Sequence, residues 1–97
     1  MSLAVTLQED RRGLILSMLD EAGGNRLADG SIKSILDTFG HRLSTDQLRA
    51  DLHWLDGQGL VRIEKTATVW MVQLLEAGQD VAGGVSHPGV RRQAPRR

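Results

Sequence analysis

The stretch of chain from residue 44 to residue 64 constrains the fold more than any other. Ser44 and Gln47 have the spacing of a capping box, in which the two residues satisfy each other's backbone N–H groups at the start of a helix. Leucines then repeat at three- and four-residue intervals and predict one buried helix face: Leu48, Leu52 and Leu55. Gly59 is the expected end of this helix. The pattern predicts a helix over residues 44–59 that leads at once into a strand.

A short β-hairpin and a last helix are expected after residue 59. Apolar and charged residues alternate over 61–64, and residues 69–74 favour a second strand. The alternation of side chains places one set of residues in the core: Trp70, Val72 and Leu74. Val69 and Met71 are expected on the other face, where they contact a partner or the last helix. That helix is predicted to end at Val81.

Two further helices are predicted earlier in the chain. Thr6 and Glu9 have capping-box spacing, and an amphipathic pattern follows over residues 7–22. After a polar loop, a second and shorter helix begins at Asp29 or Ser31, since both residue types are common helix caps.

The order of these elements predicts a winged helix-turn-helix, a mainly α fold with a small β-hairpin. It has three helices, a two-stranded wing and a C-terminal helix. The helix 44–58 takes the position of the recognition helix, and the hairpin 60–73 is the wing. A length of 97 residues suits one domain, which we expect over 1–84. Glycines and a proline after residue 82 predict that 85–97 form a flexible tail.

The charges are unevenly distributed along the chain. Residues 1–90 carry eight basic and 12 acidic residues, which gives a net charge of −4. The tail adds a charge of +4 and is expected to contact polyanions through its arginines: Arg91, Arg92, Arg96 and Arg97.

Several functional classes are not supported by the sequence. The absence of cysteine excludes disulfides, thiolate metal sites and thiol catalysis. The histidines are scattered and predict no metal site: His41, His53 and His87. No catalytic or cofactor motif is present, so we expect neither an enzyme nor a cofactor. No apolar run approaches the ~20 residues that cross a membrane, and no signal-peptide pattern opens the chain. A cytoplasmic location without a membrane partner is expected.

Two short patterns resemble the winged-helix regulators of the MarR and ArsR type. The first is the step from the recognition helix into the wing: Leu55, Gly59, Leu60 and Val61. The second is Leu74–Gly78, where Leu75 replaces the usual threonine and so removes a helix cap. More closely, residues 7–92 resemble small ArsR-labelled proteins of Mu-like phages and prophages. The resemblance implies DNA binding, transcription regulation and a homodimer. The metal-sensing residues of the ArsR sensors have no counterpart here.

The predicted interface with double-stranded DNA combines the recognition helix and the wing: Ser44, Thr45, Gln47, Arg49, His53, Arg62 and Lys65. Arg49 and His53 are one helical turn apart and suit contact with a base edge or a phosphate. The acidic residues of the same helix argue against this contact: Asp46, Asp51 and Asp56. A second hypothesis therefore stays open, in which the chain is a protein-interaction module that keeps the winged-helix shape without binding DNA.

Overall fold

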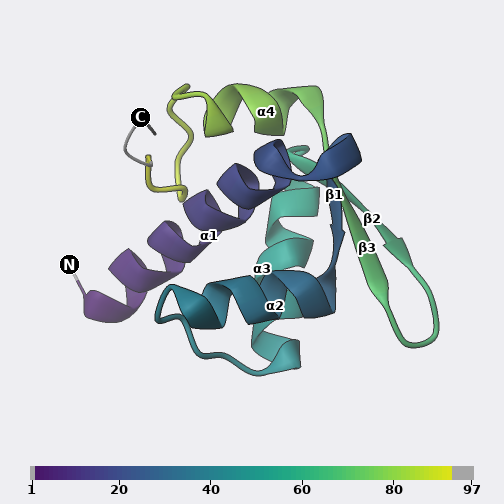
Figure 1. The fold of residues 1–97 in the computed structure, drawn as a ribbon. Helices are drawn as coiled ribbons and strands as arrows, with labels where there is room; N and C mark the ends of the chain where they lie inside the picture. The colour runs from purple at the N-terminus through teal and green to yellow at the C-terminus, as the bar shows by residue number, and fades with distance from the viewer. Residues whose placement is uncertain (1, 93–97) are drawn as a thin grey trace.

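A computed structural model describes residues 2–92 of the chain. Helices pack around one core and a small sheet lies against one side of them (Figure 1). The described elements are, in chain order, α1 (Leu3–Glu21), a 3-10 turn η1 (Gly23–Asn25), β1 (Arg26–Ala28), α2 (Asp29–Thr38), α3 (Thr45–Gly57), β2 (Val61–Lys65), β3 (Trp70–Leu74) and α4 (Glu76–Ala82). This order is that of a winged helix-turn-helix, with α2 and α3 as the helix pair and the β2–β3 hairpin as the main part of the wing.

The capping box and the buried face predicted for α3 are both confirmed. The Ser44 hydroxyl accepts a hydrogen bond from the Gln47 backbone N–H at 3.1 Å, and the Ser44 N–H donates to the Gln47 side chain at 2.8 Å. The leucines of the stripe have no exposed surface: Leu48, Leu52 and Leu55. Gly59 has a φ of +75°, a conformation that costs glycine little, and it ends the helix as expected.

The first helix begins four residues earlier than the sequence predicts. Ser2 is its cap, because its hydroxyl accepts a hydrogen bond from the Val5 N–H at 3.1 Å. The Thr6 hydroxyl instead donates to the Ser2 carbonyl oxygen, so the capping box expected between Thr6 and Glu9 is wrong. The extra turn leaves Leu3 73% exposed, since no other part of the described chain covers it.

The wing has three strands rather than the two that were predicted. β1 pairs antiparallel with β3, with Leu27 opposite Val72, and the strand order is β1-β3-β2. Three residues are too few to show the alternation that reveals a strand in a sequence. The predicted β2–β3 hairpin is present, with Lys65 opposite Trp70 next to its turn.

The base of the wing is fastened to α4. The Leu60 carbonyl oxygen accepts a hydrogen bond from the Leu75 N–H at 3.0 Å. Gly78 packs against the same carbonyl so closely that a Cβ at this position would collide with it. Leu75 makes no side-chain cap at the start of α4, in line with the loss expected from its replacement of threonine.

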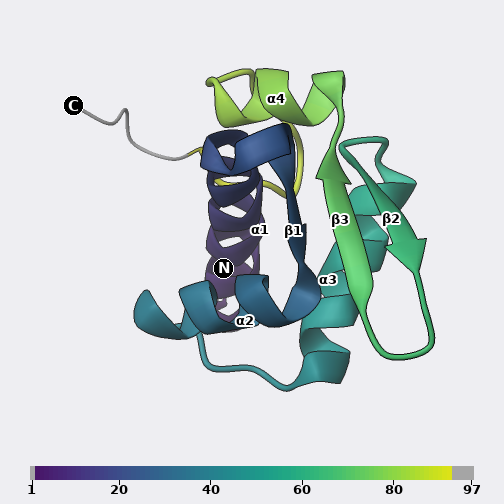
Figure 2. The same ribbon diagram turned by 45° about the vertical axis from the view of Figure 1, so that its right-hand side comes forward.

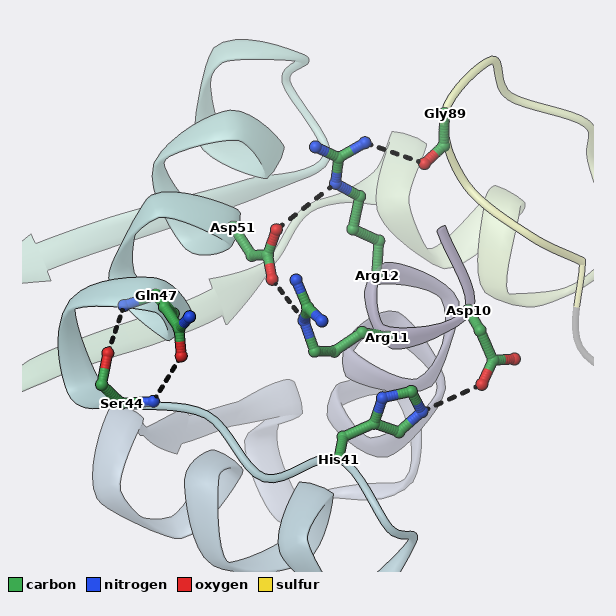
Figure 3. A network of polar contacts seen from close by, with 8 residues as sticks. All are labelled: Asp10, Arg11, Arg12, His41, Ser44, Gln47, Asp51 and Gly89. Carbon is green, nitrogen blue, oxygen red and sulfur yellow. Dashed lines mark hydrogen bonds and ion pairs between the residues drawn. The ribbon is translucent and has the colours of Figure 1, made fainter. Parts of the chain in front are cut away.

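A buried carboxylate joins α1 to α3 (Figure 3). Asp51 is 2% exposed, and its two oxygens lie 2.6 Å from Arg11 Nε and 3.6 Å from Arg12 Nε. Arg12 also donates to the Gly89 carbonyl oxygen at 3.1 Å, and its guanidinium lies 3.8 Å from the centre of the Trp54 ring. One acid thus holds two helices and a C-terminal segment together.

The described part of this C-terminal segment, residues 85–92, lies against the helices, and the flexible tail expected over 85–97 stays a prediction. Val90 packs against the core, and the Arg91 N–H donates to the Glu9 carbonyl oxygen at 3.0 Å. The contacts of Gly89 and Val90 with the helices account for its placement. Arg96 and Arg97 lie outside the described residues. Between residues 2 and 92, no helix is both long and apolar enough to cross a membrane.

The position of Leu52 leads to a prediction about stability. Leu52→Ala removes a fully buried side chain from the centre of the core. We expect a loss of about 2–5 kcal/mol in the free energy of unfolding, because the substitution leaves a cavity. Chemical denaturation measures this loss. A loss below about 1 kcal/mol would contradict the position given to α3.

The Asp51 network leads to a second prediction. Asp51→Ala leaves Arg12 partly buried without its carboxylate, and we expect a loss of about 3–5 kcal/mol. Asp46→Ala is the matched control on the same helix, because Asp46 is exposed and its removal costs only the favourable interaction with the helix dipole, about 0.3–1 kcal/mol. Equal losses in chemical denaturation would show that the Asp51 network does not hold α3 in place.

Candidate nucleic-acid interface

A groove of about 740 Å³ runs between the start of α2, the first half of α3 and the tip of the β2–β3 hairpin. Lys33 and Arg49 bring positive charge to it, and hydroxyl groups also line it: Ser31, Ser34, Thr45 and Thr68. Cations and hydroxyls of this kind bind phosphate oxygens. Of the seven residues predicted on α3 and the wing, Thr45 and Arg49 lie directly in the groove.

A second buried carboxylate organises this groove. Asp29 is 6% exposed and lies in the first turn of α2. Its Oδ2 accepts a hydrogen bond from Arg49 Nε at 2.8 Å, and its Oδ1 accepts from the N–H groups of Gly30 at 3.0 Å and Trp70 at 3.3 Å. Asp29 therefore fixes α2, α3 and β3 relative to one another at the floor of the groove.

The structure brings Arg49 and Lys65 to the same aromatic ring. The Arg49 guanidinium carbon lies 4.8 Å from the centre of the Trp70 ring, and Lys65 Nζ lies 4.6 Å from it. Lys65 stands opposite Trp70 in the hairpin, so the two side chains share one face of the sheet. The sequence predicted both cations as DNA contacts, and they meet where α3 and the wing join.

Arg62 does not join this group. It is three residues from Lys65 in the same strand, and alternation therefore sends the two side chains to opposite faces. Arg62 lines a separate hollow of about 440 Å³ together with Met71 and Gln73. Val69 lines the groove beside α3, so the outward apolar pair expected from Val69 and Met71 is divided between two surfaces.

The other residues predicted on α3 have different surroundings. Ser44 and Gln47 are exposed, and their capping hydrogen bonds use only the acceptor oxygens of the two side chains, Ser44 Oγ and Gln47 Oε1. His53 is exposed one turn beyond Arg49 and does not line the groove.

The acidic residues of α3 present less negative charge towards a nucleic acid than the sequence indicated. Asp51 is buried between two arginines and does not face a ligand. The ion pair of Arg49 is with Asp29 of α2, at 2.8 Å, and not with an acidic residue of α3 itself. Asp46 stays exposed in the first turn of α3 and is the nearest acidic residue in sequence to Thr45 in the groove.

The C-terminal arginines that the structure describes lie away from the groove. Arg91 is tied to α1 through its backbone, and the described end of the chain and the tip of the wing lie on opposite sides of the molecule (Figures 1 and 2). Any polyanion contact by Arg91 and Arg92 is therefore a separate contact from one made by α3.

The histidines lie on different elements and have different surroundings. His41 is buried, with its Nε2 3.0 Å from Asp10 Oδ2, and the His87 ring lies edge-on to Trp54 at 6.0 Å. Across residues 2–92, no three potential ligands of a metal ion gather in one place.

Sequence reasoning missed Lys33 and Trp70 as parts of the site and treated Asp29 only as a helix start. The pairing of Trp70 with Lys65 could have been predicted, because the two residues flank the turn of a predicted hairpin. The ion pair between Asp29 and Arg49 gave no local signal, since 20 residues separate its partners.

Comparison with known proteins places the chain among phage and bacterial sequences. No family model matches it. It is 38% identical to the uncharacterised protein gp26 of Escherichia phage Mu over 91 residues, which cover 93% of this chain and 94% of gp26. It is also 38% identical to an uncharacterised protein of Haemophilus influenzae over 72 residues, which cover 74% of this chain and 70% of that protein.

The fold also occurs among solved structures. A chain from the complex structure of hsRosR-S1 matches with a TM-score of 0.64 and 23% sequence identity. The match covers 74% of this chain and 63% of that chain. At this identity the likeness concerns the fold alone, and it supports the winged-helix topology described above.

The ion pair at the floor of the groove generates a third prediction. In a double-mutant cycle, Asp29→Ala and Arg49→Ala should show a coupling of about 0.5–3 kcal/mol in the free energy of unfolding, because the pair is largely buried. The matched control is the pair of Asp37 and Arg42, which lie 3.3 Å apart but are exposed, and should show no measurable coupling. Equal coupling in the two cycles would contradict a special role for Asp29.

Proposed function

The chain belongs to the same family as the phage Mu protein gp26, and we propose that it is a winged-helix protein that binds double-stranded DNA through α3 and the wing. One observation carries the proposal. The groove joins three elements that are distant in sequence, and each contributes a cation at or beside it: Lys33, Arg49 and Lys65. Phosphate contacts from several elements position a duplex on a protein.

The regulatory part of the proposal rests on the resemblance to MarR and ArsR regulators. In such a protein α3 enters the major groove while the wing contacts the neighbouring backbone. A homodimer would present two α3 helices to successive major grooves of one duplex. A phage or prophage regulator in the cytoplasm fits these features, and no catalytic step belongs to the proposal.

A second candidate function is a protein-interaction module. The observation that favours it is an apolar hollow of about 340 Å³ between α1 and α2, lined by Leu14, Met18 and Phe39 among others. Phe39 is 60% exposed beside this hollow, and Leu3 and Leu7 are exposed further along α1. Exposed apolar surface of this kind is typical of contacts with another protein.

A duplex titration at several salt concentrations separates these functions and is our fourth prediction. The full chain should bind random duplex at low salt, with an affinity that falls steeply as salt rises, because phosphate contacts release counterions. Lys65→Ala should weaken binding to all sequences similarly and reduce the salt slope by about 1. Arg62→Ala is the matched control, since it removes the same charge from the opposite face of the same strand.

The outcomes have distinct meanings. No binding by the full chain at low salt would contradict DNA binding and leave the interaction module. Equal losses in the Lys65 and Arg62 variants would contradict the face that we assign. Truncation after Arg92 removes Arg96 and Arg97 and keeps the hydrogen bond of Arg91 to α1. Loss of all binding on truncation, with no effect of Lys65→Ala, would assign the affinity to the tail.

A further inference from the structure

Trp70 occupies an unusual position at the mouth of the groove. Its ring is within 5 Å of two cations that come from different elements, Arg49 of α3 and Lys65 of β2. Its backbone N–H donates to Asp29, the acid that also binds Arg49. A single residue therefore contacts two of the three cations of the interface and the carboxylate that binds Arg49.

The charged groups around Trp70 carry an excess of positive charge. Two like charges repel each other, but the negative face of an indole ring attracts each of them, and tryptophan is the strongest aromatic partner for a cation. Asp29 neutralises only one of the two charges. The three charged groups of this cluster, Asp29, Arg49 and Lys65, sum to +1 at the junction of α3 and the wing.

The hydrogen bonds of Arg49 limit what it can bind. Asp29 engages Nε and Nη2, and the Thr68 carbonyl oxygen accepts a further bond from Nη2 at 3.3 Å. A bidentate contact with guanine uses two neighbouring N–H groups of the guanidinium fork, and most of that fork is engaged. The two N–H groups on Nη1 of Arg49 are not used by these hydrogen bonds, and they can donate to one oxygen of a phosphate.

We propose that Trp70 is a positioning residue that holds Arg49 and Lys65 against one ring as a two-point contact for the phosphate backbone of a nucleic acid. This inference rests on the proposed DNA binding and specifies its chemistry. Arg49 then contributes affinity without sequence discrimination, in contrast to a role in reading a base edge. The ligand is a phosphodiester, and its contacts come from α3 and the wing together.

The test compares duplex binding by variants of the full chain and is our fifth prediction. Trp70→Leu should weaken binding about fivefold to tenfold for all sequences and lower the salt slope, because both cations lose their support. Trp70→Phe keeps an aromatic face and should stay within about twofold of the natural protein. Trp54→Phe is the matched control, because Trp54 also contacts an arginine but lies away from the groove.

A double-mutant cycle distinguishes positioning from a general structural role. Lys65→Ala should weaken binding less in the Trp70→Leu background than in the natural protein, since Lys65 is already unsupported there. Additive losses would overturn the positioning role. The role also fails if Trp70→Leu binds like the natural protein while Lys65→Ala binds more weakly, although DNA binding itself then stands. Absence of any duplex binding by the natural protein overturns both proposals.

A second measurement covers the case in which Trp70→Leu does not fold. In the Trp54→Phe variant, Trp70 is the remaining tryptophan of the two in the sequence. Duplex binding should change its fluorescence emission, because a phosphate then lies beside the two cations that contact the ring, and adding Lys65→Ala should reduce this change. Duplex binding without a change in Trp70 emission would overturn the inference.

Discussion

The placement of α3 depends on the buried Asp51 and its two arginine partners. Burying a carboxylate is costly unless cations and hydrogen bonds satisfy it, and here adjacent residues of α1 supply both cations. Arg12 extends the network to Gly89 and Trp54, so the C-terminal segment closes over the same site. The leucine stripe gives α3 its hydrophobic stability. The Asp51 network also sets how the helix is rotated and positioned against α1.

A second acid, Asp29, acts on the opposite side of α3. Its partner Arg49 lies on the groove side of the helix, whereas Asp51 faces α1. The helix is thus held by three aspartate–arginine ion pairs on two sides: α3 provides the acid, Asp51, towards α1 and the base, Arg49, towards α2. This arrangement explains why an acidic domain presents a locally positive groove. Some of its acidic residues serve inside the structure, while Lys33 and Lys65 stay at the surface.

Local signals made much of the fold predictable. The capping box and leucine repeat located α3, and the alternation after Gly59 located the hairpin, because these patterns depend on neighbouring residues. The start of α1 and the strand β1 were missed. Ser2 competed with Thr6 as a cap, and β1 is only three residues long. The placement of Arg62 and Lys65 on opposite faces of the sheet could have been predicted, because they are three residues apart in one strand. The ion pairs of Asp29 and Asp51 were not, because they join residues 20 and 40 positions apart.

The fit of Gly78 against Leu60 has a mechanical consequence. The hairpin is anchored at its base by the Leu75–Leu60 hydrogen bond, and the glycine leaves no clearance for α4 to turn beneath it. The Leu60 carbonyl therefore contacts α4 at two points, the Leu75 N–H and Gly78, and α4 in turn packs on α1. The base of the wing and the two helices consequently form one packed corner, and a side chain larger than hydrogen at position 78 would separate the hairpin from α4.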